Sequence, residues 1–188
     1  MRGVVVGIDA AFSNMGFARM VIDTAANPRN ELLSLHLEST EGQHKKEVRK
    51  SSDDLRRARQ LYVKMQDECD GAMLAIAEVP SGSQSSRASW SLGIAVGILA
   101  SCPVTLLQVS QLEVKMASVG KKTASKDEMI EWAMALYPHT GWLLHKGRPT
   151  KANEHLADAV AIIHAGMQTE TFKLIFPGQQ STRRVKLK

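Results

Sequence analysis

The order of strand-like and helix-like segments constrains the fold of this chain more than any other sequence feature. Short apolar runs rich in β-branched residues occupy 4–9 and 16–22, and residues 31–37 alternate apolar and polar side chains. These three segments predict an antiparallel meander. Strand-like runs recur at 73–79 and 103–109, each after a helix-like segment. The order predicts an α/β fold in which a mixed sheet of five strands carries helices on both faces.

Four segments are predicted to be helical, and they are residues 52–68, 84–101, 125–136 and 153–167. One of residues 51–53 is available to cap the first of these helices. Ser125 and Glu128 form an S-x-x-E capping box at the start of the third, and Asn153 is the predicted cap of the last. Residues 111–122 are polar and contain a glycine, and we expect a loop there.

Length and composition exclude several classes of protein. A chain of 188 residues, 44% of them hydrophobic, can bury one sizeable core, which favours a single domain. The two cysteines, Cys69 and Cys102, are too few for a disulfide scaffold and belong to no zinc-binding cluster. The longest apolar runs are far shorter than the roughly 20 residues that span a bilayer, and the first residues lack a signal peptide. We therefore expect a cytoplasmic protein with no membrane partner.

The net charge of +5 is concentrated at the C-terminal end. Residues 173–188 hold five basic residues and no acidic one, so they account for the whole excess. We expect a basic tail over residues 171–188 that is flexible or that orders on DNA. A second basic concentration lies at 45–64. Such patches attract phosphate backbones, and each is equally typical of a solvated surface.

Two acidic residues stand at the ends of otherwise apolar strand-like runs. Asp9 ends the first predicted strand and Glu78 stands near the end of the fourth, and neither has a close basic neighbour in sequence. An unpaired buried carboxylate is costly unless a charge partner or a metal compensates, so two such acids indicate a shared cation. The alternative is that each acid faces water at a strand end.

The last predicted helix brings further candidate ligands. His155 and Asp158 are three residues apart and so lie on one helical face. Together with two carboxylates they form a donor set compatible with Mg²⁺ or Mn²⁺. Glu154 is either an acid that favours the helix dipole or an additional ligand. His164 is expected to be a core or surface histidine.

Four motifs, in this order and spacing, resemble Holliday-junction resolvases of the RuvC type. They are GIDAAFSNMGFA, AIAEVPSG, VKMASVGKKTASKDEM and HLADAVAIIHA, and the resemblance covers about residues 4–165. The chain departs from the family at Ala10 and Ala11, where Pro-Gly is usual, and at His155, where many members have Asp. After Glu78 it also lacks the aromatic residue that some members use as a wedge.

This resemblance implies an RNase H-like fold in a nuclease domain over residues 1–170. It also implies an active site that binds two Mg²⁺ ions, with Mn²⁺ as a substitute. The residues that match the family's catalytic metal ligands are Asp9, Glu78, His155 and Asp158.

The resemblance further implies contacts with DNA and a homodimer. Lys115 and Lys126 match family lysines that approach the cut backbone, and Lys121 and Lys122 would add nonspecific phosphate contacts. Symmetric cuts in a four-way junction need two active sites related by a two-fold axis. The helix at 84–101 is the candidate interface because Gly93, Ala95 and Gly97 permit close approach, although the same residues suit burial against its own sheet.

The implied function is that of a crossover junction endodeoxyribonuclease. It would hydrolyse phosphodiester bonds in four-way junctions, leave 5′-phosphate nicks and serve DNA recombination and repair in a bacterial or phage-infected cell. A nuclease of the same fold that acts on flaps, forks or RNA–DNA hybrids is the first alternative, and a junction-binding protein without catalysis is the second. GIDAAFSNMGFA also resembles the first phosphate loop of actin-like ATPases, but the chain is short for their two lobes.

Overall fold

The protein forms a five-stranded mixed sheet, as predicted. The computed structural model describes residues 1–25, 30–42, 49–79, 82 and 85–178. The sheet order is β3-β2-β1-β4-β5, with β1 to β3 antiparallel and with β4 and β5 parallel to β1. The strands are β1 (Arg2–Asp9), β2 (Asn14–Asp23), β3 (Glu31–Ser39), β4 (Leu74–Glu78) and β5 (Leu106–Val109).

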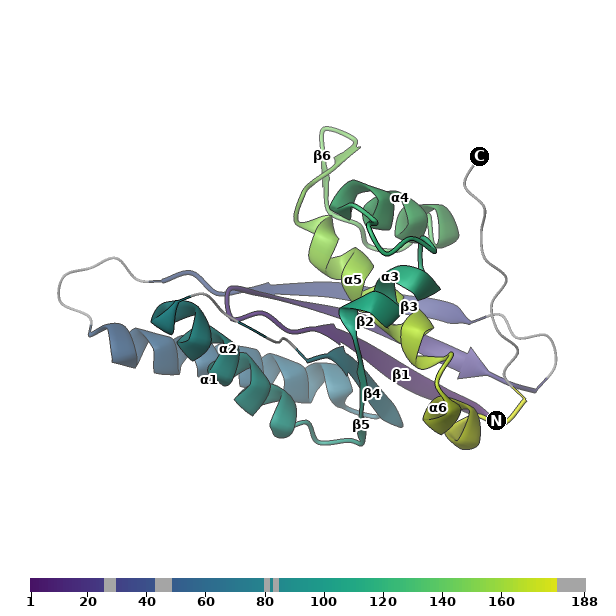
Figure 1. Ribbon diagram of the computed structural model, residues 1–188, viewed down its shortest axis with the longest axis horizontal. Helices are drawn as coiled ribbons and strands as arrows, with labels where there is room; N and C mark the ends of the chain where they lie inside the picture. Colours follow the sequence, from purple (N-terminus) through teal and green to yellow (C-terminus); the bar gives the residue numbers. More distant parts are fainter. Residues whose placement is uncertain (26–29, 43–48, 80–81, 83–84, 179–188) are drawn as a thin grey trace.

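Helices cover both faces of this sheet (Figure 1). The pair α1 (Lys50–Cys69) and α2 (Ser86–Ala100) covers one face. The other face carries α3 (Gln111–Ala117), α4 (Lys126–Leu136), α5 (Asn153–Gly166) and α6 (Glu170–Ile175). No helix among the described residues is long and apolar enough to cross a membrane.

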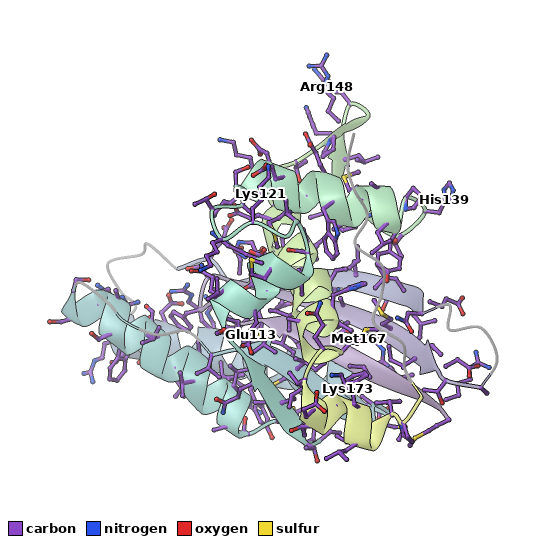
Figure 2. All side chains as sticks on the ribbon, turned by 45° about the vertical axis from the view of Figure 1, so that its right-hand side comes forward. Glu113, Lys121, His139, Arg148, Met167 and Lys173 are labelled. Atoms are coloured by element: carbon purple, nitrogen blue, oxygen red, sulfur yellow. The ribbon has the colours of Figure 1, made fainter. Side chains whose placement is uncertain are left out.

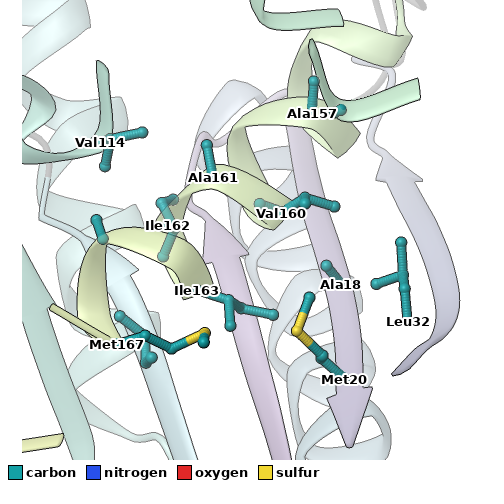
Figure 3. Close-up of a cluster of buried hydrophobic side chains, with 14 of the residues drawn as sticks. Ala18, Met20, Leu32, Val114, Ala157, Val160, Ala161, Ile162, Ile163 and Met167 are labelled. Carbon is teal, nitrogen blue, oxygen red and sulfur yellow. The ribbon is translucent and has the colours of Figure 1, made fainter. Parts of the chain in front are cut away.

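The alternation of side chains along the strands decides which residues face α5. Val5 on β1, Ala18 and Met20 on β2, and Ile76 on β4 all belong to the core on the α5 side, part of which Figure 3 shows. Successive residues of a strand point to opposite faces, so Asp9 lies on the same face as Val5 and Glu78 on the same face as Ile76. The two acids therefore end their strands on the side that α5 covers.

Two glycines let α5 lie unusually close to the sheet. A Cβ atom added at Gly7 would overlap the carbonyl oxygen of Ala159, and one at Gly16 would overlap the carbonyl oxygen of His155. A glycine inside a strand commonly marks such a close approach of another backbone. Gly16 thus determines how near the first turn of α5 comes to the end of β1.

The structure corrects three helix predictions. Residues 111–122 are not all loop, because α3 begins after Ser110, whose capping box with Glu113 has the same S-x-x-E pattern as Ser125 and Glu128. Asn153 is not a cap, because the N-cap of α5 is Ala152 and makes no side-chain hydrogen bond. The first helix likewise begins after Arg49 rather than after a serine or aspartate cap.

Residues just beyond the predicted domain boundary at 170 are packed into the core. Phe172 of α6 and Phe176 stack at 4.8 Å between ring centroids and are fully buried. The folded core therefore extends past residue 170 into the segment predicted to be a tail. Residues 179–188, which hold most of the tail's basic residues, lie outside the described part of the chain.

Two arginines of the second basic concentration, Arg56 and Arg57, make contacts within the fold. Arg57 is buried, stacks 4.1 Å from the ring centroid of Phe12 and donates hydrogen bonds to Thr40. Arg56 pairs with Asp53 at 2.8 Å. These arginines hold α1 against the sheet, so the interpretation of 45–64 as a patch for phosphate does not hold for them. Lys45 and Lys46 lie outside the described residues.

Candidate active site

Asp9 and Glu78 are neighbours at the ends of the two central strands. They are Cα partners in the parallel pairing of β1 with β4. Both side chains lie on the α5 face and are half-buried. Two carboxylates held side by side at the edge of an apolar core repel each other, which makes the position attractive to a cation.

The first two turns of α5 bring the other predicted ligands to this pair. Nδ1 of His155 lies 2.7 Å from Oδ2 of Asp9, across 146 residues of sequence. Asp158, one turn further along α5, feels the charges of Asp9, Glu78 and His155. The structure therefore brings all four predicted residues together.

The electrostatics of the site are those of crowded, partly buried acids. Burial and then the nearby charges of Asp9 and Glu78 raise the pKa of Asp158 to about 7. Burial, followed by the charge of Asp9, also raises the pKa of Glu78, and Lys115 opposes this shift. Burial and the mutual repulsion of these acids both disfavour their charged forms, and a bound cation would offset both effects.

Two basic side chains, His155 and Lys126, already contact acids at this site. The hydrogen bond to Asp9 is the main cause that raises the pKa of His155. Lys126 Nζ lies 2.5 Å from Oε2 of Glu154, and this contact raises the pKa of Lys126. Glu154 also lies 3.6 Å from Nε2 of His155, so the imidazole and the ammonium both contact carboxylates here.

The donor set matches what divalent ions of the Mg²⁺ class require. Three carboxylates supply hard oxygen donors and His155 supplies a nitrogen donor. Among the described residues, no three His, Cys, Asp or Glu side chains are close enough as they stand to hold one ion. Ion binding would require these side chains to rotate, and Asp9, Glu78 and Asp158 all keep some exposure to solvent. We conclude that the donors fit the ion chemically.

The four predicted DNA-binding lysines occupy the same side of the molecule in different settings. Lys115 lies in the last turn of α3, partly buried and within electrostatic reach of Glu78. Lys126 is exposed and pairs with Glu154. Lys121 is exposed and pairs with Glu128 at 2.7 Å. Lys122 is exposed and makes no ion pair within the described part of the chain.

Sequence reasoning missed two features that build the site. Gly7 and Gly16 admit α5 to the sheet, and a glycine inside an apolar strand was the available signal. It also missed the hairpin that precedes α5, made of β6 (Leu144–His145) and β7 (Arg148–Pro149). The signal there was Lys146-Gly147, a pair suited to a tight turn.

The chain resembles known proteins in structure rather than in sequence. No family model matches the chain, and no curated protein matches it in sequence. Thermus thermophilus RuvC matches in structure with a TM-score of 0.62 and 19% identity, covering 92% of this chain and 96% of that one. The same RuvC in complex with a Holliday junction substrate gives a TM-score of 0.64 at 19% identity, covering 94% of this chain and 97% of that one.

A viral enzyme has the same architecture. Fowlpox virus resolvase, in a complex with substrate Holliday junction DNA, matches with a TM-score of 0.54 and 12% identity, covering 88% of this chain and 99% of that one. At such identities the likeness establishes the fold. The chain has the RNase H-like fold of RuvC and other Holliday-junction resolvases.

Proposed function

We propose that this protein is a divalent-metal-dependent endonuclease that cleaves four-way DNA junctions symmetrically and leaves nicks with 5′-phosphates. The observation that carries the proposal is the convergence of Asp9, Glu78, His155 and Asp158 from β1, β4 and α5. It occurs in a fold shared with two resolvases solved with junction DNA. Its place of action would be the cytoplasm of a bacterial or phage-infected cell.

The side chains of the site have distinct roles in this proposal. Asp9, Glu78 and Asp158, with His155, would hold two Mg²⁺ ions, or Mn²⁺ in their place. When bound, such ions activate water as a nucleophile and stabilise the leaving oxygen. His155 is placed to accept a proton, because Asp9 orients its imidazole through Nδ1.

Lysines beside the acids would position the DNA backbone. Lys126 and Lys115 flank the carboxylates, and both reach the side of the site that faces solvent. A phosphate at this place would compete with Glu154 for Lys126. Lys121 and Lys122 extend the positive surface along the loop before α4. Such contacts set register on the DNA without reading its sequence.

Helix α2 is the proposed two-fold interface. Its buried side packs Ile98 and Leu99 against the sheet, and Ala95 is buried as well, so Ala95 does not contribute to a free face. Gly93 and Gly97 face open space on the other side of the helix, where Trp90 is 56% exposed. A stripe of this kind permits close packing of two copies.

Replacing Asp9 by Asn tests the chemistry. We expect the variant to bind a labelled four-way junction and to lose cleavage in Mg²⁺, whereas Asp70→Asn, at the exposed C-cap of α1, should cut normally. Cleavage by Asp9→Asn at a near wild-type rate would rule out the proposed site.

A panel of junctions, flaps, forks and RNA–DNA hybrids tests which substrate the wild-type protein cleaves. Binding of junctions without nicking would indicate a non-catalytic junction binder.

The dimer is tested separately. We expect Gly97→Arg to convert a dimer to a monomer in sedimentation and to abolish paired cuts while single nicks persist. A wild-type protein that sediments as a monomer on and off DNA would contradict the proposed interface.

A further inference from the structure

The hairpin that precedes α5 projects from the body of the molecule. β6 and β7 pair antiparallel around Lys146 and Gly147, which both have positive φ, 49° and 75°. This backbone is typical of a tight two-residue hairpin turn. The hairpin stands out beyond α4, and Arg148 marks its outer end (Figure 1, Figure 2). All residues from 143 to 149 are exposed.

The hairpin carries positive charge that the protein itself does not neutralise. No acidic residue occurs between 138 and 153, whereas Lys146, Arg148 and Lys151 are basic and exposed. None of these three makes an ion pair with another described residue. In contrast, Lys64, Lys121 and Lys173 on other surfaces each pair with a glutamate.

One face of the hairpin is polar and basic. His145 and Arg148 are directly opposed cross-strand partners, so their side chains share a face, and Leu144 and Pro149 share the other. Lys146 extends the basic side at the turn. An exposed, acid-free row of this kind is complementary to a polyanion.

The base of the hairpin is fixed to the first turn of α5. The buried Asn153 side chain accepts a hydrogen bond from the Leu143 amide at 2.9 Å and donates one to the Leu143 carbonyl at 2.8 Å. The Thr150 amide donates to the same carbonyl at 3.0 Å. The next residues of this turn are Glu154 and His155. The hairpin is therefore held in a defined relation to the acidic cluster.

We propose that the β6–β7 hairpin binds the phosphate backbone of the DNA arm next to the cleaved strand, with Lys146 and Arg148 as the contacting residues. This inference rests on the proposed function. Two extended residues, Leu144 and His145, separate Leu143 from the turn, so the tip lies roughly 7 Å beyond the base of the hairpin.

The test compares two double variants that remove the same charge. Lys146→Ala/Arg148→Ala removes the hairpin's charge, and Lys64→Ala/Lys173→Ala removes two lysines from α1 and α6. Binding of a fluorescent four-way junction is measured in EDTA at 50, 100 and 200 mM salt. We expect the hairpin variant to bind at least 10-fold more weakly at 100 mM and its log-log salt slope to fall by about 2 relative to the control.

A hairpin variant with the affinity and slope of the control would overturn the inference. Because Lys146, Arg148 and Lys173 are exposed and Lys64 is partly exposed, thermal melting should show that both variants fold like the wild type. The proposed function fails by a different result, which is absence of junction cleavage by the wild type in Mg²⁺. The binding comparison in EDTA remains decisive for the hairpin in that case, because it requires no cleavage.

Discussion

The imidazole of His155 on α5 meets the carboxylate of Asp9 at the end of β1, with 2.7 Å between Nδ1 and Oδ2. This contact joins the last strand residue before the first loop to a helix that follows almost 150 residues later. It orients the ring, and it brings the helix-borne and strand-borne acids to one place.

Removing the imidazole of His155 should lower the cleavage rate more than the affinity for the junction. We expect His155→Ala to lower the single-turnover cleavage rate on a four-way junction by about 10²-fold or more, the usual range for a lost acid–base group. Junction affinity in EDTA should change only a few-fold. His155→Asp should recover part of the rate if the residue acts as a ligand. His36→Ala, at an exposed histidine of β3, is the control, and an equal loss in that variant would contradict the assignment.

Because α5 lies so close to Gly16, a side chain at this position should destabilise the protein. A Cβ there would overlap the His155 carbonyl, so we expect Gly16→Ala to lower the free energy of unfolding by about 1–3 kcal/mol and to reduce cleavage. Urea denaturation and single-turnover rates measure the two effects. Gly141→Ala, where the new methyl group meets open space, should leave both close to wild type. A stable, fully active Gly16→Ala protein would show that α5 can shift without cost.

Asn153 should stabilise the protein through its two side-chain hydrogen bonds to the backbone of Leu143, rather than as a helix cap. Asn153→Ala removes a fully buried amide and leaves the part-buried Leu143 amide without its partner, while the Leu143 carbonyl keeps its bond from the Thr150 amide. We expect a loss of about 2 kcal/mol in the free energy of unfolding. Asn14→Ala, which breaks one exposed hydrogen bond to Ser39, should cost less than half as much. Equal losses in denaturant titrations would contradict this role.

His164 should make the protein sensitive to acid. Full burial lowers the pKa of His164 to about 4, while the unfolded chain has the ordinary value near 6.5. As the pH falls from 6.5 toward 4, the unfolded state takes up a proton that the folded state refuses, so stability falls. The residue accounts for about 3 kcal/mol over this range.

Comparison of variants isolates this contribution. His164→Gln should show a shallower loss of unfolding free energy between pH 6.5 and 4 than the wild type. Tyr137→Phe removes the hydroxyl that lies 3.0 Å from Nε2 but keeps the burial, so it should retain the steep dependence. Identical pH profiles of wild type and His164→Gln would show that other groups cause the acid sensitivity.

Glu154 should restrain Lys126 in the free protein. The pair is exposed on the lysine side, so Glu154→Gln should leave the melting temperature almost unchanged. Released from Glu154, Lys126 should bind phosphate, and we expect junction affinity in EDTA to rise several-fold with a salt slope steeper by about 1. Glu170→Gln, which breaks a similar pair with Lys173 on α6, should not change binding. Unchanged affinity in Glu154→Gln would contradict the restraint.

Much of the site was predictable because its acids stand in local patterns. Asp9 and Glu78 each end an apolar strand, and alternation along β1 and β4 places both on one face. His155 and Asp158 share a helical face. The capping box of Ser110 and Glu113 at the start of α3 is an equally local signal, and it predicts a helix where a loop was expected.

Other features had no local signal of their own. Lys126 lies in the first turn of α4, where its charge opposes the helix dipole, and the family resemblance implied only a contact with the DNA backbone. The structure supplies Glu154 from α5 instead. Asn153 is of a residue type that often caps helices, yet its side chain bonds the backbone of Leu143, ten residues earlier, at the base of the hairpin.

The amino-acid sequence by itself determined the order of strands and helices and the face on which each acid lies, because side-chain direction repeats every two residues in a strand and every three to four in a helix. Only the tertiary structure decided which of these groups touch. The contacts of His155 with Asp9 and of Lys126 with Glu154 join residues far apart in the chain. Their distances depend on how closely α5 packs on the sheet, which is a property of the assembled core.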